Sequence, residues 1–342
     1  MGRWLLALAM SLSACGAGPE DPQPSSPPPP PAAPSAPAAA PAPESPPADP
    51  PAAVGTPIVQ QCVPPTRTET APRLQEGIVY SRPGGRALAL DLARPAGAGP
   101  HPVVLVFHGG GWSAGERAHV RDDIATLATL GYAGAAVDYR LVDGRRDTSP
   151  AQVADARCAV RYLRGHAAEL GLDPDRMAAL GYSAGGHLAL MLATGSDVSG
   201  LDAGCADVST SPHVRAAIGY FPPVDLRPEA EFSRPADGVI TRLLGTTRRR
   251  DPAAAALVSP LVHVDGGDAS VLLVHGTADR VVPYQQALDM QSALERAGVP
   301  VTLVPIPEGQ HGFRLFGAGA RIRPGTCTAL AFLRANLAPR DL

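Results

Sequence analysis

Residues 177–187, Met-Ala-Ala-Leu-Gly-Tyr-Ser-Ala-Gly-Gly-His, decide the fold, because an apolar strand-like run turns there directly into a helix-like run. The central pattern Gly181-Tyr-Ser-Ala-Gly185 places small residues two positions before and two positions after Ser183. That spacing allows the strained strand-to-helix turn that projects a serine hydroxyl outward, and the helix N-terminus behind it favours developing negative charge. We therefore predict that Ser183 is a nucleophile rather than an incidental serine in a tight turn.

A run of glycines follows an earlier apolar segment. Residues 102–107 are typical of a buried strand, and His108-Gly-Gly-Gly-Trp112 comes directly after them. Consecutive glycines let backbone N–H groups approach a substrate oxygen closely, although a plain glycine loop is the alternative interpretation. We expect an oxyanion hole formed by three backbone N–H groups, those of Gly110, Gly111 and Ala184.

An acid and a base follow two later apolar runs. Asp279 ends the segment His275-Gly-Thr-Ala-Asp279, and His311 lies in Glu308-Gly-Gln-His-Gly-Phe313. A doubly wound sheet places its site beyond the carboxyl ends of its strands, where both residues would lie. The chain order Ser183, Asp279, His311 also fits this arrangement. We predict that His311 takes the Ser183 proton and that Asp279 orients the imidazole and stabilises its charged form.

Other residues compete for these roles or have weaker assignments. Trp112 and Tyr182 are predicted to wall the substrate pocket, although simple packing explains Trp112 equally well. The remaining alternatives are three histidines near the motifs and two acids, namely His187, His263, His275, Asp225 and Asp268. His108 is predicted to be a structural brace, and Asp138, Arg140 and Asp155 are predicted to form structural ion pairs. Arg248-Arg-Arg250 is predicted to be a solvated loop, with binding of an anionic substrate as the alternative.

Strand-like and helix-like segments alternate along most of the chain. Strands are expected at residues 78–80, 88–92, 102–107, 133–137, 177–182, 214–220, 270–275 and 301–306. Helices are expected at residues 121–130, 152–170, 184–193, 283–297 and 325–337. This rhythm predicts an α/β fold in which a mainly parallel, doubly wound sheet carries helices on both faces.

Composition excludes several classes of function. The 342 residues carry 29 basic and 32 acidic side chains, a formal charge of −3, so no generally basic nucleic-acid footprint is present. No Cys/His cluster has metal-ligand spacing, and we expect neither a metal nor a cofactor. The sequence does not fix the oligomeric state. Four cysteines allow three disulfide pairings, with free thiols as a further alternative, and these are Cys62, Cys158, Cys205 and Cys327.

The N-terminal region is predicted to hold an export signal followed by a spacer. Residues 1–14 combine one arginine with a nine-residue apolar run, Trp4–Leu12, as in an export signal. The following Cys15 resembles the lipidated cysteine of a bacterial lipoprotein, which implies an anchor in a membrane, the outer one where a bacterium has two; an ordinary secretory signal is the alternative. Residues 15–65 hold a stretch rich in proline and alanine and are predicted to be a disordered tether. The catalytic domain is expected at residues 66–342.

Three motifs together resemble the α/β-hydrolase superfamily: HGGGW from His108, GYSAGG from Gly181, and HGTAD with GQHGF towards the C-terminus. The chain is similar to bacterial acetyl-esterase and feruloyl-esterase-like proteins, neighbours of hormone-sensitive-lipase-like esterases and kynurenine formamidases. The resemblance covers residues 74–337. It implies a cofactor-free serine esterase that acts on small carboxylic esters. Residues 142–144 depart from the Ala-Pro-Glu of the hormone-sensitive-lipase-like group, which puts a large helical lid in doubt.

We therefore expect a serine carboxylesterase for short-acyl esters, including acetylated or feruloylated carbohydrates. Three alternatives remain: a peptidase of the prolyl-oligopeptidase kind, a kynurenine-formamidase-like amidase, and a surface lipoprotein that only binds. The first lacks its usual accessory propeller here, and the third leaves an intact set of catalytic residues unexplained. Fold alone does not name the substrate.

Overall fold

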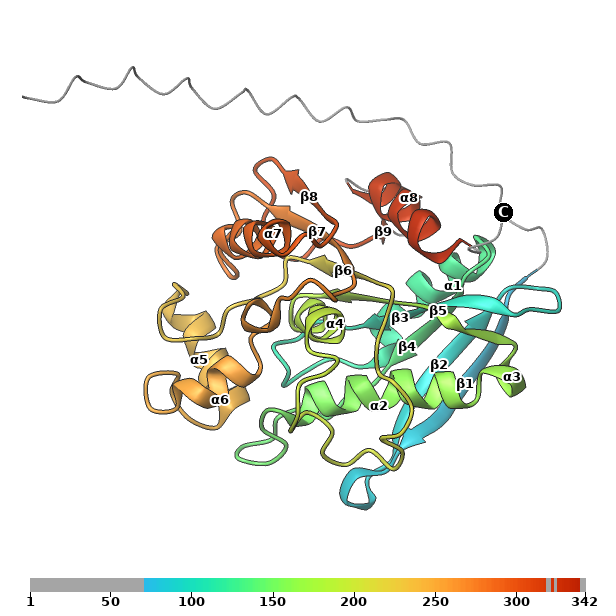
Figure 1. Ribbon diagram of the computed structural model, residues 1–342, viewed down its shortest axis with the longest axis horizontal. Coiled ribbons are helices and arrows are strands. Elements are labelled where there is room, and N and C mark those ends of the chain that lie inside the picture. The colour runs from blue at the N-terminus through green and yellow to red at the C-terminus, as the bar shows by residue number, and fades with distance from the viewer. Residues whose placement is uncertain (1–70, 318–320, 323–324, 339–342) are drawn as a thin grey trace, which may run out of the picture. The chain divides into compact units, whose positions relative to one another are not determined.

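The chain forms a mixed sheet of eight strands in the order β1-β2-β4-β3-β5-β6-β7-β8 (Figure 1). The structure, a computed structural model, describes residues 71–317, 321–322 and 325–338. The predicted signal (residues 1–14), Cys15 and the predicted tether (residues 15–65) lie outside the described residues. Among the described residues, no helix is long and apolar enough to cross a membrane.

Each of the eight predicted strands is present. They are β1 (Arg73–Ser81), β2 (Leu88–Arg94), β3 (His101–Phe107), β4 (Ala133–Val137), β5 (Leu172–Tyr182), β6 (Ala216–Tyr220), β7 (Ser270–Gly276) and β8 (Val301–Ile306), with a separate pair β9 (Phe316–Gly317) and β10 (Arg321–Ile322). Strands β1 and β5 begin five residues earlier than predicted, and the pair β9–β10 was not predicted. The pairs β1–β2 and β2–β4 are antiparallel, and all pairs from β4 through β8 are parallel. The carboxyl ends of β3, β5, β7 and β8 therefore meet at one edge, as the sequence predicted.

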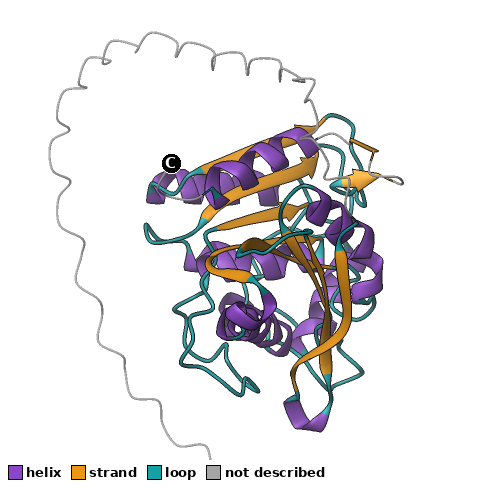
Figure 2. Ribbon diagram, turned by 90° about the vertical axis from the view of Figure 1, so that its right-hand side faces the viewer, coloured by secondary structure: helices purple, strands orange, loops and turns teal. Residues whose placement is uncertain are grey.

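Helices cover both faces of this sheet (Figure 2). On one face, α1 (Arg121–Thr129) and α8 (Thr326–Leu337) pack against residues such as Val104 of β3. On the other face, α2 (Ala151–Gly165), α4 (Ala184–Thr194) and α7 (Gln285–Ala297) pack against residues such as Leu105. Alternate β3 side chains thus enter opposite cores, because successive strand side chains point to opposite faces. The predicted doubly wound α/β architecture is confirmed.

The predicted helix at residues 152–170 was wrong in its length. The structure breaks it into α2 and a short α3 (Ala167–Leu170). The break falls at His166, whose ring Nδ1 lies 2.9 Å from the Tyr162 carbonyl oxygen and whose ring stacks on that of Tyr162. The His166 N–H still donates to the same carbonyl at 3.0 Å, so the break lies in the His166 backbone, whose φ of −105° and ψ of 16° depart from the helical values.

The connection between β6 and β7 holds two helices that the sequence analysis missed, α5 (Arg234–Leu244) and α6 (Pro252–Leu257). Each begins with a side-chain cap followed by proline: Ser233 accepts the Ala236 N–H, and Asp251 accepts the Ala254 N–H at 2.9 Å. Short 3-10 turns complete the described elements at η1 (Pro83–Gly85), η2 (Arg117–Val120) and η3 (Pro260–His263).

Arg248, in the loop between α5 and α6, was predicted to be solvated, but its side chain is only 10% exposed. Its guanidinium donates to Asp237 at 2.7 Å and to the Ala230 carbonyl at 2.9 Å, so that it ties α5 to the chain that precedes it. The structure therefore assigns Arg248 to packing, whereas Arg249 and Arg250 are exposed, as predicted for this loop.

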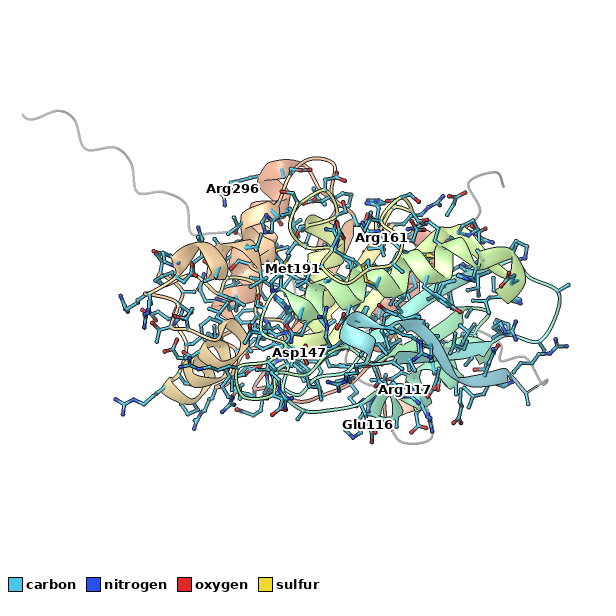
Figure 3. All side chains as sticks on the ribbon, turned by 90° about the horizontal axis from the view of Figure 1, so that it is seen from below. Glu116, Arg117, Asp147, Arg161, Met191 and Arg296 are labelled. Atoms are coloured by element: carbon cyan, nitrogen blue, oxygen red, sulfur yellow. A yellow bond between two sulfur atoms is a disulfide. The ribbon has the colours of Figure 1, made fainter. Side chains whose placement is uncertain are left out.

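A disulfide joins Cys158 on α2 to Cys205 in the long loop after α4, with Cα atoms 5.3 Å apart. Two α2 arginines reinforce the same join, because Arg157 and Arg161 both donate to Asp202. Arg161 is labelled in Figure 3. Cys327 is disulfide-bonded as well, and Cys62 lies outside the described residues. The structure thus selects one pairing that the sequence left open.

Candidate active site

Ser183 occupies a strained turn between β5 and α4. Its φ of 52° lies in the left-handed region that non-glycine residues rarely adopt. Two close backbone approaches hold this turn: a Cβ on Gly181 would lie 2.0 Å from the Gly185 carbonyl oxygen, and one on Gly185 would lie 2.2 Å from that of Phe107. Only glycine fits at these two positions, which gives the Gly-x-Ser-x-Gly pattern its physical reason.

The structure brings three predicted side chains together in one row of hydrogen bonds, Ser183–His311–Asp279. His311 Nε2 lies 2.9 Å from Ser183 Oγ, and His311 Nδ1 lies 2.7 Å from Asp279 Oδ2. These are hydrogen-bond distances that join groups 128 and 32 residues apart in sequence. With Nδ1–H donated to Asp279, Nε2 is free to accept the Ser183 proton.

The environment of Asp279 keeps its carboxyl ionised. Burial by itself acts to raise the pKa of Asp279, but hydrogen bonds from His275, His311 and backbone N–H groups outweigh burial and hold the pKa well below its ordinary value. The Val281 and Val282 N–H groups donate to Oδ1 at 2.8 and 3.0 Å. Asp279 is therefore a fixed negative charge beside the imidazole at neutral pH.

The competing histidines are held elsewhere. His108 stacks on Tyr139 with ring centroids 4.4 Å apart, in agreement with its predicted role as a brace. His187 is fully buried, and its Nε2 lies 2.7 Å from the Val258 carbonyl oxygen. His263 Nε2 lies 2.9 Å from a carbonyl oxygen of α6. None of the three reaches Ser183.

His275 supports the row from behind. Its ring is fully buried and its Nε2 lies 3.5 Å from Asp279 Oδ2 and 2.9 Å from the Val282 carbonyl oxygen. His275 therefore contacts the acid rather than the nucleophile. The sequence offered it only as a competitor of His311, and its position on the strand that leads to Asp279 is the signal that locates it.

The alternative acids and the predicted ion-pair residues have structural partners. Asp225 pairs with Arg227 at 2.9 Å, and Asp268 accepts the Asp265 N–H at 2.8 Å. Further pairs join the predicted ion-pair residues, namely Arg140 with Asp155 at 2.8 Å and Asp138 with Arg117. Neither alternative acid hydrogen-bonds to His311 in the described part of the chain.

The glycine loop lies beside Ser183 with its backbone exposed to a substrate. Gly110 and Gly111 have φ values of 122° and 57°, and a Cβ on Gly110 would lie 2.1 Å from the Ala114 carbonyl oxygen. Within the described residues, the N–H groups of Gly110 and Gly111 donate to no other protein group. Ala184 is the first residue of α4, so that its N–H lies at the positive end of the helix. The three predicted oxyanion-hole donors are thus free for a ligand oxygen.

Two side chains fix this loop. The Trp112 indole N–H lies 3.2 Å from His187 Nδ1, which accepts because Nε2–H is donated to Val258. Arg117, at the far end of the loop and labelled in Figure 3, donates to the fully buried Asp91 at 2.8 Å. It also pairs with Asp138. Burial lowers the pKa of His187 to about 4, so the imidazole that accepts from Trp112 stays neutral.

Ser183 and His311 line a cavity of about 630 Å³. Its other walls are mainly apolar and include Phe221, Phe232, Val239, Ile240, Val281 and Phe313. Helix α5 supplies part of the wall, so the connection that the sequence analysis treated as loop shapes the pocket. Trp112 and Tyr182 line the cavity as predicted, but they are only 2% and 5% exposed. Among the described residues, no cluster of metal-ligating side chains is present.

A mainly parallel sheet with a serine at the strained turn after β5 defines the α/β-hydrolase fold. Residues 90–294 match the BD-FAE family model, and the chain belongs to this family. Among curated proteins, it is 30% identical over 247 residues to the "Probable carboxylic ester hydrolase LipM" of Mycobacterium tuberculosis, covering 68% of this chain and 55% of that protein. The chain spans a little over half the length of such relatives.

Solved structures resemble the whole catalytic region. A truncated carbohydrate esterase from gut microbiota matches with a TM-score of 0.68 and 26% identity, covering 80% of this chain and 100% of that one. Esterase 2 of Thermogutta terrifontis matches with a TM-score of 0.66 and 32% identity, covering 80% and 95%. That esterase has also been solved with propionate bound, with butyrate bound and phosphonylated by sarin.

Proposed function

We propose that the chain is a serine carboxylesterase that hydrolyses short-acyl carboxylic esters. The observation that carries the proposal is the row of hydrogen bonds from Ser183 through His311 to Asp279, with 2.9 and 2.7 Å between the paired atoms. Esterase names among the relatives and structural neighbours support the same reaction class.

The mechanism is a two-step acyl transfer. Ser183 Oγ attacks the ester carbonyl carbon while His311 Nε2 removes its proton, and the carbonyl oxygen becomes an oxyanion. The N–H groups of Gly110, Gly111 and Ala184 stabilise that charge. The alcohol leaves with the proton from His311 and an acyl-enzyme remains, which water, deprotonated by His311, cleaves to release the acid.

The substrate class within the esters rests on the neighbours. The related esterase was solved with propionate and with butyrate bound, which favours a short acyl group here. The carbohydrate esterase among the neighbours favours acetylated or feruloylated carbohydrates as the natural esters. An apolar cavity with few polar groups suits an ester bond that is shielded from water.

A chain-length series tests this proposal. The full chain and its Ser183→Ala variant are assayed on 4-nitrophenyl acetate, butyrate and decanoate, and then on acetylxylan and feruloyl esters. Hydrolysis that falls with acyl length and disappears in the variant supports the proposal. A folded wild type that cleaves none of these esters but cleaves an N-formyl or a peptide amide would replace it with one of the amide-hydrolase alternatives.

We also propose that the protein is exported and anchored through a lipid on Cys15. The Cys158–Cys205 disulfide supports export, because disulfides persist in oxidising compartments. Labelling of cells that express the chain with an alkyne palmitate tests the anchor. Label that depends on Cys15 is expected, and equal labelling of a Cys15→Ser variant contradicts the proposal.

A further inference from the structure

Tyr182, the residue before Ser183, makes polar contacts that the chemical steps do not use. Its hydroxyl donates to Asp123 Oδ2 on α1 at 3.0 Å and accepts the Leu315 N–H at 3.1 Å. These contacts join parts of the chain that are 59 and 133 residues away from Tyr182 in sequence. The sequence analysis placed Tyr182 in the pocket wall, but its polar atom is engaged inside the protein.

Asp123 collects a second donor from the chain beyond His311. Arg314 Nη2 lies 2.8 Å from Asp123 Oδ2, and the guanidinium carbon lies 5.3 Å from the centroid of the Tyr182 ring. Burial raises the pKa of Asp123, while the charge and hydrogen bond of Arg314 oppose that rise. The Asp123 carboxylate, the Tyr182 hydroxyl and the Arg314 guanidinium thus form a small hydrogen-bonded network. Asp123, which both donors share, is only 1% exposed.

The loop that carries His311 is held on both sides of that residue. Upstream, Gly309 accepts the Ala278 N–H at 3.1 Å, which fixes the loop to the turn that holds Asp279. Downstream, Leu315 is bound by Tyr182, which fixes the loop to the strand that presents Ser183. His311 must reach both Asp279 and Ser183, and each of these contacts helps to set its distance to one of them.

We propose that Tyr182 is a positioning residue for His311, holding the downstream end of its loop against the strand that carries Ser183. The inference rests on the proposed function, because it assigns His311 the role of base. Displacement of a reacting group by 1 Å can cost about 100-fold in rate. Loss of the Tyr182 hydroxyl leaves the other contacts of the loop in place, so kcat should fall by only about 10-fold and KM should be nearly unchanged, since the hydroxyl is bound to Asp123 and Leu315.

Tyr220 offers a matched control. It pairs with Tyr182 across neighbouring strands, its ring lies 5.2 Å from that of Tyr182, and it is fully buried. Its hydroxyl has no hydrogen-bond partner within the described residues. The changes Tyr182→Phe and Tyr220→Phe thus delete the same atom at neighbouring places, one in the network and one outside it.

The experiment compares wild type, Tyr182→Phe, Tyr220→Phe and Ser183→Ala as full chains, well below the melting temperature of each. Two measurements are made. The first gives kcat and KM for 4-nitrophenyl butyrate. The second gives the rate of covalent labelling by a fluorophosphonate, which needs Ser183 and His311 but no ester turnover. Tyr182→Phe is expected to slow both rates about 10-fold, with Tyr220→Phe within about twofold of wild type.

Equal rates for the two tyrosine variants overturn the proposal, as does a lowered melting temperature in Tyr182→Phe with unchanged kcat. Leu315 is also held by Thr326, so Tyr182→Phe is expected to fold. Should it not fold, Arg314→Gln, whose side chain is 42% exposed, removes the other arm of the network and is expected to slow labelling about threefold. Absence of ester turnover with normal labelling of wild type rejects the proposed function and still tests the positioning.

Discussion

The two halves of the site are held by different kinds of contact. The half that presents Ser183 is built from backbone at close quarters, through the glycines at 181 and 185. The half that presents His311 combines one such backbone approach, Gly276 against Gly309, with side chains from distant elements, chiefly Asp279 and Tyr182. The glycines around Ser183 stand in one contiguous motif, which a sequence displays. Side-chain anchors need only the right residue at the right place in the fold, which a sequence does not display.

The largest expected effect falls on the His311 half. Asp279→Asn replaces the acceptor of His311 Nδ1–H by an amide, which favours the wrong tautomer and loses the stabilisation of the imidazolium. The kcat for 4-nitrophenyl butyrate at pH 8 should fall by about 10⁴-fold, as for other triads of this kind. Steady-state kinetics measure this, with circular dichroism to verify folding.

His275→Asn is the control for that change. It removes the contact 3.5 Å behind Asp279 and leaves the His311–Asp279 hydrogen bond in place. Its loss of kcat should be far smaller. A comparable loss in both variants would mean that His275 takes a direct part in the proton transfer.

Two glycine-to-alanine changes compare the two halves of the site by their effect on the free energy of unfolding. Gly181→Ala forces a Cβ to within 2.0 Å of a carbonyl oxygen and should cost about 3 kcal/mol of unfolding free energy. Gly312→Ala, beside His311, meets no atom within 4 Å and has only its φ of 106° to strain it, so about 1 kcal/mol is expected. Urea unfolding measures both. The comparison breaks down if Gly312→Ala proves the more destabilising.

The pH dependence of stability tests the half of the site that presents Ser183, through the buried His187. Its pKa of about 4 in the folded protein lies below the ordinary histidine value of ~6.5, so the unfolded chain binds a proton first as the pH falls. The stability that His187 contributes is complete above pH ~6.5 and is lost between there and pH ~4.

Urea unfolding at pH 7 and pH 4.5 measures that loss. The wild type should lose about 2 kcal/mol more than His187→Gln does between the two pH values. The variant itself is less stable at pH 7, because it weakens the support of Trp112. Parallel pH dependence of the two proteins contradicts the neutral, buried imidazole.

The smallest effect is expected outside both halves, at Asp268. Burial, together with the charges of Asp265 and Asp197, raises its pKa to about 7. Between pH ~4 and 7, Asp268 has lost its proton in the unfolded chain but keeps it in the folded protein. The free energy of unfolding therefore falls as the pH rises over this range. Asp268→Asn should raise Tm by about 2 °C at pH 8 and leave it unchanged at pH 4, by calorimetry. An unchanged Tm at pH 8 is the contrary result.

Sequence reasoning located the strands and the three residues of the row, because strand ends and glycine spacing are local properties. It missed α5 and α6, although Ser233 and Asp251 carry capping signals close to proline; α6 is only six residues long and buries a single alanine, Ala255. It placed Tyr182 in the pocket wall, where the residue does lie, but missed the contacts of its hydroxyl with Asp123 and Leu315, which exist only after three distant segments meet. The break at His166 falls inside a stretch whose periodicity indicated one continuous helix, because it lies in the backbone angles of one residue.

The central claim is that Ser183 becomes acylated with help from His311 and Asp279. The most direct measurement is peptide mass spectrometry of the full chain, quenched in acid milliseconds after mixing with 4-nitrophenyl butyrate. The account predicts a butyryl group on Ser183 in the wild type and none in Ser183→Ala. A butyryl group on another residue, or ester turnover that survives in Ser183→Ala, contradicts it.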